Sequence, residues 1–332
     1  MSTAGRLTLR TTLRPRRVAS LARRARRVGL DGVLAALDRE AVPCPVPGTA
    51  AGPGYTWAPA DADDPGWMPQ GVATTRGGGV LLVAWYSRRR RGRTAGTRVT
   101  VVDLRDRDRV RYRHVLLVRP RPWAAVTGAG RVAVHAGGLA VVGDLLYVAD
   151  TVRGVRLFGL DDVLRMPDGT DVLPQTGHLH QRVLPGTAPL RWSFLGVGRV
   201  HGELSLVAGE YGRRGTRPRL VRHALDEVTG LPVAGARGRA RPPQVHAQQP
   251  HRMQGVAVHD DLWVATSSTG EGSPGDLYVG APGAFRRHRG VLPTGPEDLA
   301  WSVPGRVAWS VTEWPGRRWV FPIDVARWVR PD

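Results

Sequence analysis

Residues 135 to 151 read HAGGLAVVGDLLYVADT and predict a β-hairpin. A short apolar strand follows the glycine pair, the chain turns at Gly143-Asp144, and a second apolar strand ends on Asp150. Two apolar runs separated by such a turn are typical of paired antiparallel strands. The same layout recurs in degenerate form at four other places: Gln70 before LLVAWYS, Ser193 before LSLVAGEY, Gln254 before DLWVATSS, and Glu297 before VAWSVTE.

Each of the five repeats has room for four strands. In the first repeat, apolar runs predict strands at 71–75, 80–87, 98–104 and 111–118. Four antiparallel strands per repeat are typical of a β-propeller blade. The repeats open at positions 70, 135, 193, 254 and 297, which is too long and irregular a spacing for a solenoid. We therefore expect an all-β protein, a β-propeller of five blades with four antiparallel strands in each.

The fifth repeat lacks a fourth strand before the chain ends. Closed propellers commonly complete the last blade with a strand from the other terminus, because an unpaired edge exposes backbone donors and acceptors. Gly54 to Ala58 is the candidate for this strand. We expect three parts, a basic extension (1–41), a Pro/Gly-rich arm (42–65) and the propeller domain (66–332). Deleting residues 1–60 should then destabilise the domain, whereas the extension alone should be dispensable for folding.

The N-terminal extension predicts one amphipathic helix from Val18 to Ala41, with its arginines in the first half. This helix would pack on the domain or contact an anionic membrane surface. The arginines interrupt the apolar core that an export signal requires. We therefore expect no export signal in the chain as written, which by itself corresponds to a cytoplasmic protein, and the location is left open. No apolar run approaches the length of a membrane span, so no transmembrane segment is expected.

The chain has 332 residues and a net charge of +20, and its 48 basic side chains are all arginine. The absence of lysine is typical of a high-GC genome, whereas the excess of positive charge bears on solubility and partners. The arginine runs lack interleaved aromatic residues on which single-stranded bases stack, so we expect no nucleic-acid partner. Cys44 is alone and can form no internal disulfide. We expect a monomer.

The hairpin geometry predicts where polar side chains gather. In an antiparallel hairpin, the residue before the first strand and the residue that ends the second strand lie at the same end. If the first strand of each blade is innermost, these residues surround the mouth of the central channel. They are the candidate ligand-binding residues: Gln70, His135, Asp150, Glu210, Gln254, Glu297 and Glu313. Such residues could alternatively bond neighbouring loop amides and hold the blades together.

Three classes of function are open for this site. The first is the binding of a small polar ligand, a carbohydrate or a hard cation; carboxylate and amide oxygens suit Ca²⁺, with Asp150, Glu297 and Glu313 as metal ligands. The second is a glycosidase-like hydrolase with two carboxylates, for which a separation of about 5 to 10 Å is expected. The third is a scaffold or adhesion module without a ligand. His178 and His180 are two apart and could share a metal from one face of a strand.

The chain also resembles a family of mostly secreted, propeller-like proteins of high-GC Gram-positive (actinobacterial) bacteria. The resemblance covers about residues 54–322 and implies a propeller fold, but no activity. The motifs on which the resemblance rests include the following: Trp67-Met68-Pro69-Gln70-Gly71, Ala84-Trp85-Tyr86, His135-Ala136-Gly137-Gly138, Tyr147-Val148-Ala149-Asp150-Thr151, Met253-Gln254-Gly255, Gly295-Pro296-Glu297-Asp298-Leu299 and Thr312-Glu313-Trp314-Pro315-Gly316.

Overall fold

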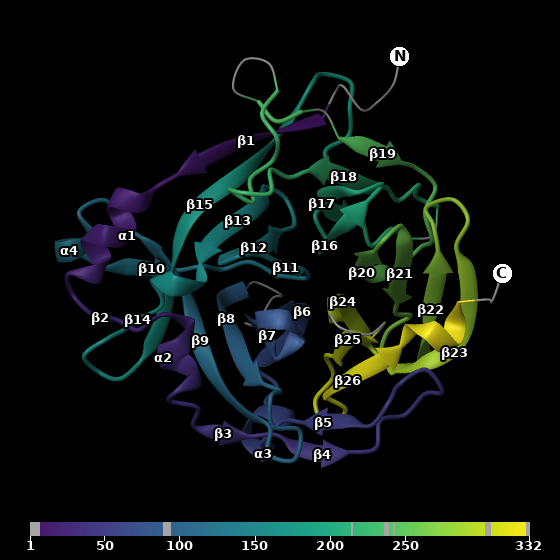
Figure 1. The fold of residues 1–332 in the computed structure, drawn as a ribbon, viewed down its shortest axis with the longest axis horizontal. Helices are drawn as coiled ribbons and strands as arrows, with labels where there is room; N and C mark the ends of the chain where they lie inside the picture. Colours follow the sequence, from purple (N-terminus) through teal and green to yellow (C-terminus); the bar gives the residue numbers. More distant parts are fainter. Residues whose placement is uncertain are drawn as a thin grey trace.

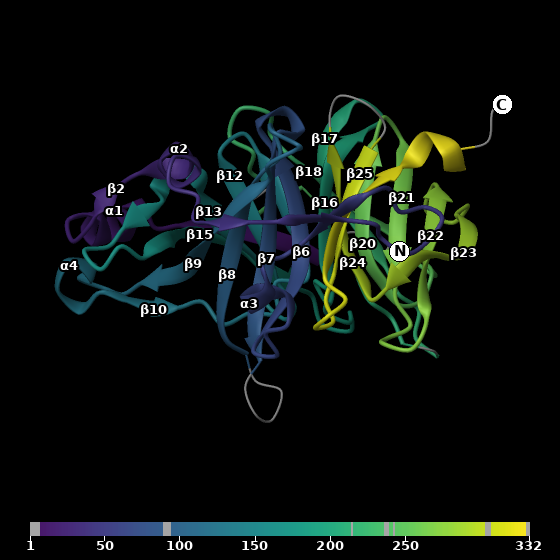
Figure 2. The same ribbon diagram turned by 90° about the horizontal axis from the view of Figure 1, so that it is seen from below.

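The computed structural model describes residues 7–88, 94–213, 215–235, 239–241, 243–302 and 307–329. Within these ranges most of the ordered chain is β-strand, and the helices are short. The strands form antiparallel groups that follow one another in the sequence and stand around a common axis (Figure 1). Figure 2 shows the same groups from the side. The all-β prediction is confirmed, and the radial arrangement is that of a β-propeller.

Each group is an antiparallel meander whose first strand lies nearest the axis (Figure 1). The first two groups comprise β6 (Trp67–Thr75), β7 (Val80–Arg88), β8 (Thr94–Asp103) and β9 (Arg111–Pro120), then β11 (Leu139–Val142), β12 (Leu145–Asp150), β13 (Gly154–Gly159) and β15 (Asp171–Val183). The next two comprise β16 (Phe194–Val200), β17 (Glu203–Gly209), β18 (Leu220–Ala224) and β19 (Gln244–His246), then β20 (Met253–His259), β21 (Leu262–Ser267), β22 (Pro274–Gly280) and β23 (Arg286–Thr294). The last comprises β24 (Pro296–Ser302), β25 (Val307–Thr312) and β26 (Trp319–Asp324), with β5 (Gly54–Thr56) and β4 (Val42–Cys44) from the arm.

The outer strands of the first two groups are joined. Strand β15 is 13 residues long and pairs in parallel with β9, with Val172 opposite Leu116. The two groups therefore belong to one 13-stranded sheet. Short additional strands pair along its outer part: β2 (Arg26–Arg27), β3 (Arg39–Glu40), β10 (Ala129–Arg131) and β14 (Leu164–Arg165). The repeat pattern did not predict this parallel contact, because it lies between repeats and not within one.

The innermost strands approach one another closely at glycine positions. The backbone nitrogen of Gly71 in β6 donates to the carbonyl of Ala136, just before β11, over 3.1 Å. A methyl group on Gly138 would overlap the backbone nitrogen of Leu195 in β16. Only glycine allows two backbones to come this close. The glycine pair that marks the second repeat is thus explained by packing against the next inner strand.

The arm closes the last group, as the sequence analysis predicted. Strand β5 pairs with β26, with Trp319 opposite Thr56 and Val320 opposite Tyr55. The next residue, Trp57, is 1% exposed, and its ring lies against those of Trp85 (centroids 4.9 Å apart) and Tyr112 (5.0 Å) in the first group. The arm therefore connects the last group of strands to the first, through backbone pairing on one side and aromatic packing on the other.

The N-terminal extension differs from the single helix expected at Val18 to Ala41. The chain forms α1 (Pro15–Ala22) and α2 (Gly29–Leu34), with β2 between them. Gly29 has a φ of +61°, a conformation that does not continue a right-handed helix. Other short helical segments are α3 (Pro59–Ala62), η2 (Arg76–Gly78), α4 (Ala124–Thr127), η4 (Leu160–Asp162) and η6 (Val325–Trp328). In the described ranges no helix combines the length and apolar character needed to span a bilayer.

The extension also begins with a strand that the sequence analysis missed. Strand β1 (Leu7–Leu13) pairs with β15 along its whole length, and Leu7 and Leu9 are 2% and 0% exposed. Burying two leucines contributes a few kcal/mol in favour of folding. The extension is therefore integrated into the sheet, and the expectation that it is dispensable for folding is not supported.

We predict that Trp57→Ala destabilises the protein by about 3 to 5 kcal/mol, the usual cost of emptying a buried tryptophan site. The change removes the ring that links the arm to Trp85 and Tyr112. Equilibrium denaturation measures the loss. Trp123, which is 82% exposed, provides the matched control, and Trp123→Ala should leave stability nearly unchanged. Equal midpoints for the two variants would contradict the assignment of the arm.

Candidate binding site at the channel mouth

Two glutamines donate hydrogen bonds to two glutamates at one end of the inner strands. Nε2 of Gln70, in β6, donates to Oε2 of Glu313, which follows β25, over 2.8 Å. Nε2 of Gln254, in β20, donates to Oε1 of Glu297, in β24, over 3.0 Å. Each bond crosses between neighbouring groups of strands. Four of the seven predicted site residues are thus arranged as two amide–carboxyl pairs.

The two carboxyl groups lie next to each other. Burial raises the pKa of Glu297 well above its usual range, and the charges of Glu313 and Asp298 and a hydrogen bond with Glu313 raise it further. Burial raises the pKa of Glu313 to about 7, against the lowering effect of the bond from Gln70. Adjacent buried carboxyl groups cannot both ionise at low cost, so they retain a proton between them. Near neutral pH the pair therefore carries less negative charge than two glutamates in water.

Tyr86 and His135 complete this group, and their ring centroids are 4.5 Å apart. Burial raises the pKa of Tyr86 to about 12, and the negative charges of Glu313 and Glu297 also raise it. Burial lowers the pKa of His135 to about 4, although the residue as a whole is exposed to solvent. We call the following residues the mouth cluster: Gln70, Tyr86, His135, Gln254, Glu297 and Glu313.

Bulges in the inner strands present the mouth cluster. The register of β6 against β7 shifts between Pro69 and Val72, which brackets Gln70. The same shift occurs between Met253 and Gly255, around Gln254 in β20. A third lies between Pro296 and Leu299, around Glu297 in β24. A bulge turns a side chain out of the regular alternation of a strand and is common beside functional sites. In three repeats, a bulge in the inner strand thus places a polar side chain at the same end of the strand.

Two predicted site residues are engaged elsewhere. Asp150 accepts hydrogen bonds from Nε and Nη2 of Arg156 at 3.0 and 2.8 Å. Glu210 accepts from Nε and Nη2 of Arg219 at 2.9 and 2.7 Å, and also from the backbone nitrogen of Arg191. Both carboxylates therefore hold strands and loops together, which is the structural role that the sequence analysis left open for the whole set.

The predicted metal set of Asp150, Glu297 and Glu313 is not brought together. The ion pair of Asp150 with Arg156 removes it from the mouth cluster. In the ranges that the structure describes, no group of three or more His, Cys, Asp or Glu side chains is placed to hold a metal. The amide nitrogens of Gln70 and Gln254, and not their oxygens, face the two glutamates, whereas Ca²⁺ takes oxygen ligands.

The sequence analysis did not include Tyr86 in the site. Strand pairing places Pro69 opposite Trp85 and Pro296 opposite Thr312, so Tyr86 and Glu313 occupy equivalent positions one residue beyond. Tyr86 lies within β7, whereas Glu313 follows β25, so the end of the strand does not mark the two positions alike in the sequence.

Asp298 is the second residue that the sequence analysis missed. Its Oδ2 accepts hydrogen bonds from the backbone nitrogens of Val72 in β6 and Leu139 in β11, both at 3.0 Å. The side chain is fully buried, and burial raises its pKa well above the usual range despite these bonds. One carboxyl group thus joins three inner strands directly beneath the mouth cluster.

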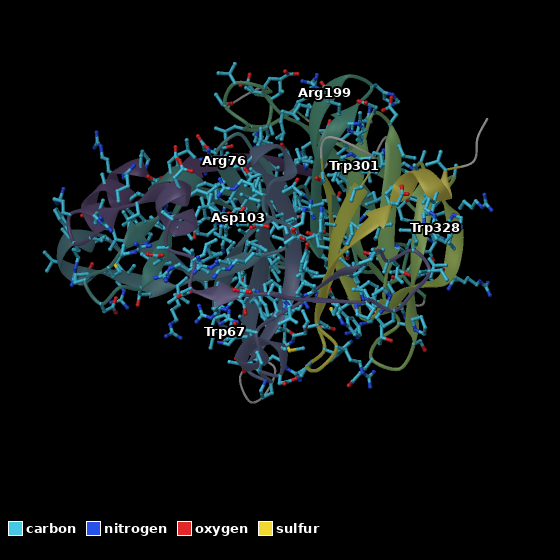
Figure 3. All side chains as sticks on the ribbon, turned by 60° about the horizontal axis from the view of Figure 1, so that its bottom comes forward. Trp67, Arg76, Asp103, Arg199, Trp301 and Trp328 are labelled. Carbon is cyan, nitrogen blue, oxygen red and sulfur yellow. The ribbon has the colours of Figure 1, made fainter. Side chains whose placement is uncertain are left out.

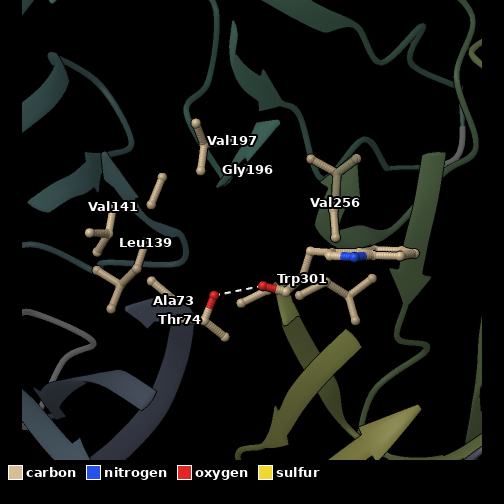
Figure 4. A pocket seen from close by; sticks show the side chains of 12 residues that line it. Ala73, Thr74, Leu139, Val141, Gly196, Val197, Val256 and Trp301 are labelled. Atoms are coloured by element: carbon tan, nitrogen blue, oxygen red, sulfur yellow. Dashed lines mark hydrogen bonds between the residues drawn. The ribbon is translucent and has the colours of Figure 1, made fainter. Parts of the chain in front are cut away.

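The axis also contains a small cavity of about 70 Å³ beyond the mouth cluster (Figure 4). The later residues of the inner strands line it, and Oγ1 of Thr74 donates to the carbonyl of Trp301 over 2.6 Å at its wall. Figure 3 shows Trp301 and Trp67, which begins β6, toward opposite ends of the molecule. The lining is mostly aliphatic, and the volume is that of a few water molecules at roughly 30 Å³ each. The ionisable side chains of the axis are therefore at the mouth, whereas backbone groups and aliphatic side chains line the cavity.

Neither a protein-family model nor a curated protein sequence matches the chain. Among solved structures, a β-xylosidase is 12% identical with a TM-score of 0.43, over 80% of this chain and 93% of its own. The β-propeller domain of Cps50 (Swd1) from Myceliophteria thermophila is 14% identical with a TM-score of 0.38, over 77% and 83%. A GH43_1 enzyme from Xanthomonas citri in complex with xylose is 13% identical with a TM-score of 0.36, over 93% and 92%. At these TM-scores the similarities carry no argument about activity.

We predict that Asp298→Ala destabilises the protein by about 2 to 6 kcal/mol, because two buried N–H groups lose their acceptor at roughly 1 to 3 kcal/mol each. Asp298→Asn keeps an oxygen in place and should cost much less. Chemical denaturation of the two variants gives the comparison. Equal losses would contradict the bridging role of the carboxyl oxygen.

We predict that Glu313→Gln removes part of the loss of stability that accompanies a rise in pH from about 4.5 to 7. The pKa of Glu313 is raised from 4.5 to about 7 in the folded protein, so between these values the unfolded state ionises first and the folded state is disfavoured by up to about 3 kcal/mol. The Tm of the wild type should therefore fall relative to that of the variant between pH 4.5 and pH 7, and the two curves should run parallel above pH 8. Glu227→Gln, at an exposed site, is the control. Parallel Tm curves for wild type and Glu313→Gln between pH 4.5 and pH 7 would show that the carboxyl group titrates normally.

Proposed function

We propose that the protein is a five-bladed β-propeller that binds a small, uncharged polar ligand, of the carbohydrate class, at the mouth cluster. The observation that carries this proposal is the joined pair of amide–carboxyl contacts, Gln70 with Glu313 and Gln254 with Glu297. Amide and protonated carboxyl groups offer donors and acceptors together, which is what a hydroxyl-rich molecule requires.

The blade number rests on the inner strands. Strands β6, β11, β16, β20 and β24 each open one antiparallel group, and each lies beside the next around the axis. The contact of β24 with β6 closes this order. Five groups of at least four strands, with the arm completing the last, fit a propeller of five blades.

An uncharged ligand fits the electrostatics better than a cation. The raised pKa values of Glu297 and Glu313 mean that the pair holds a proton near neutral pH. The positive charges of Arg88 and Arg318 also act on Glu313, and they oppose the binding of a metal cation beside it. The adjacent rings of Tyr86 and His135 supply an aromatic surface on which the apolar face of a sugar can lie.

The hydrolase alternative has one observation in its favour. A glutamate with a pKa of about 7 is suited to general acid–base chemistry near neutral pH. The carboxyl groups of a retaining glycosidase are about 5 to 5.5 Å apart, those of an inverting one are farther apart, and both must be free to reach the substrate. The hydrogen bonds that both carboxyl groups already accept from glutamine amides favour a binding role.

We predict that a neutral saccharide raises the Tm of the protein at pH 6, because a ligand that binds only the folded state stabilises it. A thermal-shift screen of neutral mono- and disaccharides, with CaCl2 in a separate arm, measures this. Gln254→Ala should reduce the shift at least severalfold. Gln244→Ala, at an exposed position of β19, should leave it unchanged.

Three outcomes would contradict the proposal. A saccharide-induced shift that persists in Gln254→Ala would place binding elsewhere. Stabilisation by CaCl2 alone would favour the cation site. Turnover of a glycoside by the wild type, lost in Glu297→Gln, would favour the hydrolase.

A further inference from the structure

A second polar pocket lies on the outer side of the molecule, away from the mouth cluster. It encloses about 140 Å³ where α1 and the outer strands β9, β13 and β15 meet. Five arginines from three separate segments line it, and we call this site the basic pocket: Arg14, Arg17, Arg119, Arg153 and Arg156. Such a concentration of positive charge within one small cavity is costly unless a negative partner offsets it.

The described chain supplies one acidic side chain to this region. Asp150 pairs with Arg156, at 2.8 Å between carboxylate oxygen and Nη2. Among the ion pairs of the described residues, none involves Arg14, Arg17, Arg119 or Arg153. Four guanidinium groups around the cavity are therefore left without a carboxylate partner in this part of the chain.

A buried histidine in the wall points to a ligand independently of the arginines. His178, in β15, is 8% exposed, lines the pocket, and has a buried Nε2 without a hydrogen-bond partner in the described structure. Its ring lies 3.9 Å from that of His180, which also lines the pocket. A buried polar atom without a partner is uncommon and requires an explanation such as a bound group.

The surroundings of the histidine pair disfavour the metal site that their spacing suggested. Burial lowers the pKa of His178 to about 4, and the positive charges of His180, Arg156 and Arg153 lower it further, against the raising effect of Asp150. Burial also lowers the pKa of His180, as do the positive charges of Arg182, Arg14 and Arg10. A divalent cation would meet the same repulsion, whereas an anion would be attracted.

The start of α1 adds to the attraction for an anion. Arg14 is its N-terminal cap residue, and the helix has neither a side-chain cap nor an acidic residue in its first turn. The partial positive charge at a helix N-terminus favours phosphate and similar anions. Arginine in turn matches the oxygen geometry of phosphate with its planar fork of donors.

We propose that the basic pocket binds a phosphate group, either as free phosphate or at the end of a larger molecule. The cavity is smaller than the roughly 300 to 1,000 Å³ of sites that enclose a drug-sized ligand, so it would take the phosphate and leave the remainder outside. This site is independent of the proposed saccharide site, and neither depends on the other.

Calorimetric titration with inorganic phosphate and pyrophosphate at low salt tests whether the basic pocket binds free phosphate. Arg153→Gln and Arg119→Gln should each weaken binding about tenfold or more, because each removes charge-assisted hydrogen bonds. Both side chains are exposed at the surface, so the variants should fold, and circular dichroism verifies this. Arg286→Gln, an exposed arginine of β23, makes the same change of net charge far from the pocket and should bind as the wild type does.

Cosedimentation with phosphatidylcholine vesicles, with and without phosphatidic acid, tests whether the basic pocket binds a phosphate group carried by a lipid. Binding that depends on phosphatidic acid and on Arg153, without binding of free phosphate, would assign the ligand to a lipid headgroup. Absence of binding in both arms would overturn the proposal. So would an equal loss in Arg286→Gln and Arg153→Gln, since that result would reflect only the overall charge of +20.

Discussion

The carboxyl group of Asp298 is the contact on which the centre of the molecule depends. It lies in β24 and accepts from backbone N–H groups of β6 and β11, so a single side chain fixes the relative position of three inner strands. Those N–H groups face another strand's side chain instead of a ladder partner because the inner strands converge on the axis. Without this acceptor, two buried donors would be unsatisfied at the point of closest packing.

The mouth cluster follows from this convergence. Once the inner strands are held together, the bulges at Gln70, Gln254 and Glu297 turn their side chains toward one another. Burial of the resulting pair of carboxyl groups raises their pKa values, since neither has an arginine as a direct ion-pair partner in the described structure. The carboxylates of Asp150 and Glu210, in contrast, each pair with an arginine in or beside the next strand of their own group and act as structural ion pairs. A carboxyl group therefore forms a structural ion pair where an arginine lies on the adjacent strand, and it has a raised pKa in the mouth cluster where none does.

Positive and negative side chains are distributed differently between the axis and the outer strands. The net charge of +20 is not spread evenly, because the axis contains amides and carboxyl groups while arginines crowd the outer strands. The basic pocket forms only where the N-terminal extension crosses β15, which brings Arg14 and Arg17 beside Arg119 and Arg153. Its residues are separated by up to about 140 positions of sequence, and no local pattern in the chain relates them.

The amino-acid sequence by itself determined the repeat, the antiparallel strands and the strand at Gly54 that completes the last group. These depend on local alternation and turn chemistry and on the need to cover an open edge, all of which can be read along the chain. It also placed Gln70, His135, Gln254, Glu297 and Glu313 at one end of their hairpins. Only the tertiary structure decided which of the acidic residues meet an arginine, that Tyr86 and Asp298 join the site, and that the extension pairs as β1. Those outcomes depend on which strands become neighbours and on single-residue shifts of register, and a shift of one residue reverses the face of every side chain that follows.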